Sequence, residues 1–166
     1  MQCTLFARIP LQRRDGTIVA YTIVDVEQAA YLSQWRWRLH SGGYAYRAVG
    51  SSSTGNRRLI LMHRVILGLS EGGHTPEADH VNRDRLDNRL SNLRLATHAE
   101  NMQNRPSHHG GSSKYRGVHW DASAQRWRTM VKINGKRYFR RVFRDEDEAG
   151  AAVKAWRLAH MPFAVD

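Results

Sequence analysis

A break in composition at residues 105–113 limits how this chain can fold. The stretch reads RPSHHGGSS, with a proline near its start and Gly and Ser after it, which is typical of a flexible linker. A coil of eight or nine residues spans roughly 15 to 18 Å. The 166 residues are also enough for two small domains. The sequence therefore predicts two modules that reorient but stay close, divided by a linker at 106–113.

Residues 1–56 predict an α+β extension. The runs TLFARIP and TIVAYTIVD flank Asp15-Gly16, which indicates a hairpin. The segment VEQAAYLSQWRW follows Asp25, a candidate N-cap, and predicts a short helix. Its apolar face would carry Ala29, Leu32 and Trp35. The runs GYAYRAV and RLILMHRVIL predict further strands, and the loop Gly50–Gly55 between them is interpreted as a turn.

The segment of residues 77–105 sets an Asp-His pair among Asn and Arg residues. PEADHV predicts a short strand that ends at Asp79-His80, and NRDRLDNRLSN predicts a polar loop. Thr97 and Glu100 have the spacing of a capping box, so a helix should start at His98 and end by Arg105. Because the pair lies at a strand end, its carboxylate and imidazole can aim at one point.

These residue types suit metal-assisted phosphodiester cleavage. The carboxylate of Asp79 and the amide oxygen of Asn101 are hard ligands that fit magnesium, with manganese as the alternative. His80 could deprotonate the attacking water, since an imidazole titrates near neutral pH. The metal would stabilise the leaving oxygen.

Residues 57–105, with MHRVILG and DHVNRDRLDNRLSNLRLATHAENMQN, resemble the HNH endonucleases, in particular the phage and intron-associated homing type with a ββα-metal core. The resemblance implies that His80 is the general base, that Asp79 and Asn101 bind the metal, and that Asn92 orients the loop and the base. Asn101 stands where many members have His, which fits the magnesium-using branch.

Several other polar residues of this segment allow two interpretations. His98 is a further catalytic candidate through a phosphate contact near the positive helix end, or else an exposed helix residue. Four arginines are backbone clamps on DNA or a solvated face, namely Arg83, Arg85, Arg89 and Arg94. Asn82 and Asn88 are interpreted as turn residues, and His63 as a core residue.

Residues 114–166 predict a three-stranded sheet packed on one helix. The strands are YRGVHWD, RWRTMVKI and KRYFRRVF, the last two joined by Asn134-Gly135, and RDEDEAGAAVKAWRLAH is the helix, with Asp145 and Glu148 as its capping box. Residues 114–144 hold ten Lys or Arg and one acid. Alternation on the second strand directs these cations to the face away from the helix, where a major groove could receive them.

Residues 113–160 resemble the Apetala/ERF-type DNA-binding domain of plant regulators, through YRGVHW, Trp127, Phe143 and EDEAGAAVKAW. The resemblance implies DNA contacts by Arg116, His119, Arg128, Lys132 and Arg137. His119 stands where many plant members have Arg, so a base preference does not carry over. The alternative is a solvated cationic face without a specific partner.

The net charge of +11 favours a nucleic acid as the partner, with an anionic membrane surface as the runner-up. The two resemblances imply that this nucleic acid is double-stranded DNA. Only four of the 26 basic residues are lysines, and Arg forms bidentate contacts with phosphate and guanine. No window is apolar enough for a membrane span, and the start lacks a signal peptide. One cysteine cannot form an internal disulfide. We expect a cytoplasmic protein of a bacterial host, encoded by a phage or mobile element, and no membrane partner.

These observations together predict an α+β protein with a ββα-metal HNH core and an N-terminal strand-helix-strand extension. Its function would be metal-dependent DNA cleavage, as a nick or a double-strand break, by a monomer or a dimer assembled on DNA. The C-terminal domain would select the sites, and Arg13, Arg14, Arg36 and Arg38 are candidates for extra DNA contacts. A non-catalytic DNA-binding regulator and an RNA-binding protein remain the alternatives.

Overall fold

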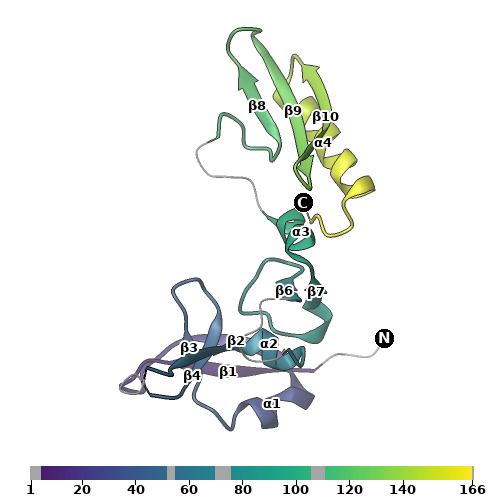
Figure 1. The fold of residues 1–166 in the computed structure, drawn as a ribbon. Coiled ribbons are helices and arrows are strands. Elements are labelled where there is room, and N and C mark those ends of the chain that lie inside the picture. Colours follow the sequence, from purple (N-terminus) through teal and green to yellow (C-terminus); the bar gives the residue numbers. More distant parts are fainter. Residues whose placement is uncertain (1–4, 52–54, 70–75, 106–110, 166) are drawn as a thin grey trace. The chain divides into compact units, whose positions relative to one another are not determined.

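The computed structural model describes residues 5–51, 55–69, 76–105 and 111–165 (Figure 1). The chain divides into two compact units, Met1–Thr97 and His98–Asp166. Both consist of small antiparallel sheets with few helices, so the α+β class is confirmed. The division falls inside the module predicted at 57–105, and most of the predicted linker lies outside the described residues. The bounds predicted for the four segments, 1–56, 57–105, 106–113 and 114–166, therefore stay predictions.

The first unit begins with the predicted hairpin. Strands β1 (Phe6–Gln12) and β2 (Ile18–Asp25) pair antiparallel, and Gly16 in the turn has a φ of +92° that favours glycine. Ile9, Leu11 and Val24 point from the hairpin into the core of this unit. The sequence prediction of a hairpin around Asp15-Gly16 is confirmed.

Helix α1 (Val26–Leu32) follows Asp25, as predicted, but ends earlier than residue 37. The indole nitrogen of Trp37 donates to the carbonyl of Leu32 at 2.7 Å, which satisfies one of the carbonyls left open at the helix end. Asp25 makes no side-chain cap bond. Its carboxylate instead accepts from the backbone N–H of Leu90 at 2.7 Å.

A three-stranded sheet follows, with β3 (Arg38–Leu39), β4 (Ala45–Val49) and β5 (Arg58–Leu61) in that order. The strand predicted for RLILMHRVIL is wrong in its second half, because α2 (Met62–Ile66) begins there. Met62, Val65 and Ile66 recur at helical spacing and pack on the same core. Residues 52–54 of the glycine-rich loop lie outside the described residues.

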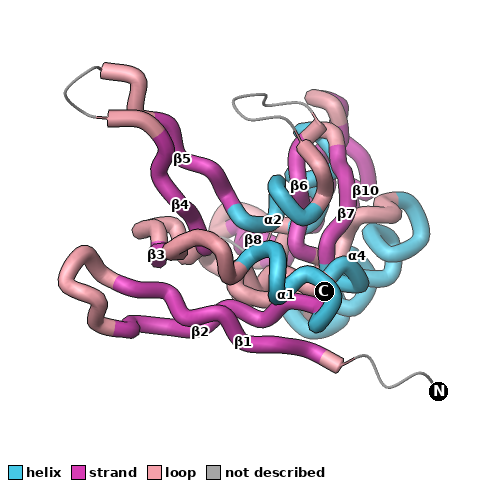
Figure 2. Tube along the Cα trace, turned by 90° about the horizontal axis from the view of Figure 1, so that it is seen from below, coloured by secondary structure: helices cyan, strands magenta, loops and turns pink. Residues whose placement is uncertain are grey.

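Strands β6 (Glu77–His80) and β7 (Leu93–Ala96) form an antiparallel pair, and Figures 1 and 2 show them side by side. The strand predicted to end at Asp79-His80 is confirmed. The polar loop that follows includes the 3-10 turn η1 (Leu90–Asn92). The backbone of Ile23 in β2 forms two hydrogen bonds with this loop. Its carbonyl accepts from the N–H of Asn88, and its N–H donates to the carbonyl of Leu86. The N-terminal hairpin therefore supports the loop.

The second unit opens with α3 (His98–Asn101) and the 3-10 turn η2 (Met102–Asn104), which confirms a helical segment from His98 that ends by Arg105. Strands β8 (Val118–Asp121), β9 (Arg126–Ile133) and β10 (Lys136–Phe143) form a sheet in the order β10-β9-β8. Helix α4 (Glu146–His160) packs on it. The prediction of a three-stranded antiparallel sheet on one helix is confirmed.

Local residues explain the shape of this unit. Asn134 and Gly135 have φ values of +48° and +81° in the β9–β10 turn, as the primed turn of a two-residue hairpin requires. The carboxylate of Asp145 accepts from the backbone N–H of Glu148 at 2.9 Å, which is the predicted helix cap. On β9 the buried Thr129 and Val131 alternate with the exposed Arg128, Met130 and Lys132, so one face is covered by the helix.

Candidate active site

His80 lies at the end of β6 and is only 4% exposed. Two aromatic side chains of the same unit surround its ring: the centroids of Tyr44 and His63 lie 6.0 and 5.0 Å from it. His63 is buried, as predicted. The imidazole of His80 is therefore held in a fixed, largely dry environment rather than on a mobile surface.

A chain of hydrogen bonds assigns the protons on His80. The hydroxyl of Thr22 donates to the carbonyl of Leu86 at 2.7 Å, so it accepts from the side-chain NH₂ of Asn88, also at 2.7 Å. That orientation directs Oδ1 of Asn88 at Nε2 of His80, 3.1 Å away. A carbonyl oxygen only accepts, so Nε2 carries the proton and Nδ1 carries the lone pair.

Burial keeps both histidines of this cluster neutral. Desolvation lowers the pKa of His80, although the contact with Asn88 and the charge of Asp79 partly oppose it. Desolvation lowers the pKa of His63 to about 3, with a further contribution from His80. A neutral imidazole is the form that accepts a proton.

Asn92 holds the loop that carries Asn88. Its side-chain oxygen accepts from the backbone N–H of Asn82 at 2.9 Å, and its NH₂ donates to the carbonyl of Asp87 at 2.8 Å. The sequence missed the direct partner of His80, which is Asn88, only 1% exposed. Its neighbours in sequence are typical of a turn, and the contact depends on Thr22, which lies 66 residues away.

Asp79 is 7% exposed, and its Oδ2 accepts from Nε and Nη2 of Arg94 at 2.8 and 2.7 Å. Arg94 is its cross-strand partner on β7. The guanidinium holds the carboxylate in one orientation. The carboxylate remains a hard oxygen ligand. Among the described residues, no three His, Cys, Asp or Glu side chains gather as a metal site.

Asn101 and His98 belong to α3 of the second unit. Along the chain, β6, β7 and α3 have the order strand, strand, helix. The convergence of Asn101 with Asp79, the role of His98 and the ββα-metal arrangement stay predictions.

The four arginines predicted to clamp DNA near this site differ in their surroundings. Arg89 forms a two-point contact with Asp87, both at 2.7 Å, and this contact is the main cause of the lowered pKa of Asp87. Arg85 donates to the carbonyl of Gly42 and its guanidinium lies over the ring of Tyr44. Arg94 pairs with Asp79, and Arg83 has a φ of +66° in the loop. Three of the four thus support the loop or the strand pair.

The DNA contacts predicted in the second unit also differ. His119, Lys132 and Arg137 are exposed on the sheet. Lys132 of β9 is the cross-strand partner of Arg137 in β10. Arg128 is exposed and forms an ion pair with Asp121. The guanidinium of Arg116 donates to the carbonyls of Met102, Gln103 and Arg105, which is a structural role that the resemblance does not predict.

Comparisons with known proteins match the part of the chain that holds this site. The sequence model of the family described as HNH endonuclease matches residues 61–103. An uncharacterized HNH endonuclease of Acanthamoeba polyphaga mimivirus is 31% identical over 128 residues, which cover 75% of this chain and 60% of the relative. Protein 3.8 of Escherichia phage T7 is 33% identical over 60 residues, 36% of this chain and 50% of that protein.

The chain thus spans between half and 60% of the length of these relatives. No solved structure matches it with significance. No helix within the described ranges is long and apolar enough to cross a membrane. The resemblance of residues 113–160 to Apetala/ERF-type domains lies outside the family match and stays a prediction. Residues 61–103, which contain Asp79, His80, Asn88 and Asn92, are the part of the chain that is similar to the HNH endonuclease family.

Proposed function

We propose that the chain is a metal-dependent DNA endonuclease in which His80 is the general base. The observation that carries the proposal is the hydrogen-bond chain from Leu86 through Thr22 and Asn88 to His80. It keeps the proton on Nε2, so Nδ1 can take a proton from the water that attacks phosphorus. The new oxygen–phosphorus bond replaces the bond to the leaving oxygen of the nucleotide.

Asp79 and Asn101 are the proposed ligands of a divalent cation, with magnesium preferred and manganese as the alternative. Bound there, the cation would stabilise charge on the phosphate and the leaving oxygen. Arg94 holds Oδ2 of Asp79 and so fixes which way the carboxylate faces before a metal binds. His98 is proposed to contact a phosphate oxygen near the start of α3.

The second unit is proposed to select the sites that are cut. Its sheet exposes His119, Arg128, Lys132 and Arg137, and a cationic β-sheet face fits the major groove of duplex DNA. Residues 57–105, which include His98 and Asn101, would supply the cut, as a nick or a double-strand break. The similarity to protein 3.8 of phage T7 supports a role in the cytoplasm of a bacterial host, whereas the relative named as an HNH endonuclease comes from a mimivirus.

A supercoiled plasmid assay with magnesium and with EDTA tests the proposal. The wild-type protein should cut only with the metal, and His80→Ala should lose cleavage while it still binds DNA. Persistent binding without metal-dependent scission would favour the non-catalytic regulator. Cleavage by His80→Ala at the wild-type rate would show that another group is the base.

A further inference from the structure

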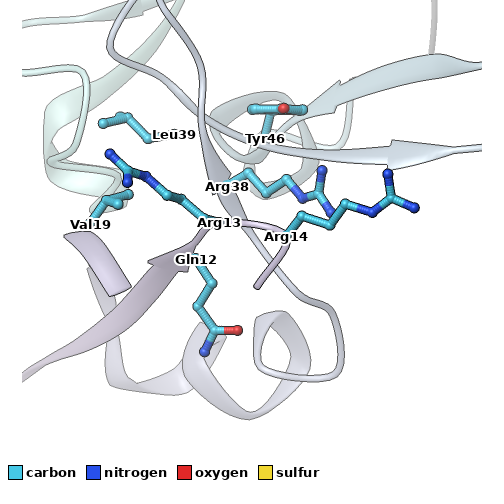
Figure 3. Close-up of a pocket in the computed structure, with 7 residues that line it drawn as sticks. All are labelled: Gln12, Arg13, Arg14, Val19, Arg38, Leu39 and Tyr46. Carbon is cyan, nitrogen blue, oxygen red and sulfur yellow. The ribbon is translucent and has the colours of Figure 1, made fainter. Parts of the chain in front are cut away.

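Arginines gather around two surface depressions of the first unit. Figure 3 shows the first, of about 340 Å³, which Arg13, Arg14 and Arg38 line. The second, of about 330 Å³, shares Arg38. We call the set the arginine surface: Arg13, Arg14, Arg36, Arg38, Arg47 and Arg57. The sequence indicated four of these residues, and the fold adds Arg47 and Arg57.

Four chain segments present these side chains on an ordered frame. Leu11 of β1 and Trp37, just before β3, are fully buried, and the N–H of Gln12 donates to the carbonyl of Trp37 at 2.8 Å. This contact places the β1–β2 turn beside β3. Arg38 pairs with Tyr46 of β4, and Val49 of β4 pairs with Arg58 of β5, which follows Arg57. The arginines are therefore displayed by backbone that the core holds in place.

Positive charge dominates this surface, although Asp15 in the β1–β2 turn interacts with the charge of Arg13. Neither depression has an Asp or Glu among the described residues that line it. Arg13, Arg14, Arg36 and Arg57 are exposed, and in Figure 3 the side chains of Arg14 and Arg38 extend in the same direction. Like charges that share a surface repel one another, and an anion with several charges would offset this cost.

We propose that the arginine surface binds the phosphodiester backbone of duplex DNA. A guanidinium forms two parallel hydrogen bonds to a phosphate. Duplex DNA presents about one negative charge per 1.7 Å of helix axis. A surface with several arginines can therefore contact several phosphates at once. The contact reads no sequence and involves no cleavage. It rests on the proposed function only for the choice of DNA among polyanions.

The test is the salt dependence of binding to a random-sequence DNA duplex in EDTA, where cleavage is not measured. The variant replaces the four exposed arginines (Arg13→Gln, Arg14→Gln, Arg36→Gln, Arg57→Gln). Each phosphate contact adds about 0.9 to the slope of log affinity against log salt concentration, so the slope should fall by up to about 3.6. From 50 to 200 mM salt, the wild-type protein should lose about a hundredfold more affinity than the variant.

The matched control replaces the same four residues with lysine and keeps the charge. It should retain most of the wild-type slope, and unfolding curves should show that both variants fold. A wild-type slope in the glutamine variant would overturn the proposal, as would a lysine variant as weak as the glutamine variant. The proposal also fails if the glutamine variant loses binding to duplex RNA or to phosphatidylserine vesicles but not to DNA. None of these results depends on whether His80 is a base.

Discussion

Nε2 of His80 lies 3.1 Å from Oδ1 of Asn88, and this contact makes Nδ1 the basic nitrogen of the ring. Asn88 cannot rotate its amide without losing the bond from its NH₂ to Thr22. Thr22 in turn is committed as a donor to the carbonyl of Leu86. A threonine of the N-terminal hairpin thereby determines the tautomer of the proposed base.

Replacing Asn88 with alanine should therefore lower cleavage and leave DNA binding in EDTA unchanged. Loss of the partner that orients a metal-ligating histidine typically costs about 10- to 100-fold in activity, and we expect a loss of this order for the proposed base. Nitrogen NMR of the His80 ring should show Nε2 protonated in the wild-type protein and a mixture of tautomers in Asn88→Ala. Asn82→Ala is the matched control, because Asn82 lies in the same loop but contacts Asp87. An unchanged tautomer in Asn88→Ala would contradict the assignment.

Acid should destabilise the first unit through His63. Its pKa is about 3 in the folded protein, because burial disfavours the cation, and near 6.5 in an unfolded chain. Between these values only the unfolded chain binds the proton, so the stability that is complete above pH 6.5 is lost as the pH falls. The loss should reach about 2 kcal/mol at pH 5.

This effect is measured by urea unfolding at pH 7 and pH 5, followed at the amide of Val24 in the core of the first unit. His63→Gln removes the titrating group. Between pH 7 and pH 5, the variant should therefore lose about 2 kcal/mol less unfolding free energy than the wild-type protein. Equal pH dependence in both proteins would mean that other groups cause the acid sensitivity.

The pair of Asp79 and Arg94 predicts a link between magnesium and stability. Arg94→Met leaves the buried carboxylate without its guanidinium, which should cost about 3 kcal/mol in EDTA. If Asp79 is a metal ligand, magnesium replaces the lost positive charge. Magnesium should then raise the melting temperature more in Arg94→Met than in the wild-type protein.

Arg89→Met is the control for that experiment. It breaks a similar two-point contact, with Asp87, at a residue that is not a proposed ligand. Magnesium should not restore its stability. Equal responses of the two variants to magnesium would argue against Asp79 as a ligand.

The sequence predicted those parts of the fold that depend on neighbouring residues. The turn at Asn134-Gly135, the cap at Asp145 and the strand ending at Asp79-His80 each need only a few adjacent side chains. The change from strand to helix at Met62 was missed because a short apolar run fits the periodicity of a strand as well as that of a helix. Local patterns thus account for most elements but not for all of their ends.

The parts of the site that were missed depend on residues far apart in the chain. Thr22 and Asn88 are 66 positions apart, and Arg85 donates to Gly42 across 43 positions. Composition could not show that arginines near the site form contacts inside the protein. Spacing identified the Asp-His pair, whereas only the fold shows what orients His80.

Arg116 and Lys132, both proposed as DNA contacts by the resemblance, differ in their surroundings in the second unit. The guanidinium of Arg116 donates to three carbonyls at the end of η2, whereas Lys132 is exposed on β9. Arg116→Gln should lower the melting temperature and speed amide exchange at Asn104, with no change in the salt dependence of DNA binding. Lys132→Gln should leave the melting temperature unchanged and lower the salt slope by about 0.9, one phosphate contact. If Arg116→Gln instead lowers the slope by the same amount without loss of stability, its guanidinium leaves the η2 carbonyls for phosphate when DNA binds.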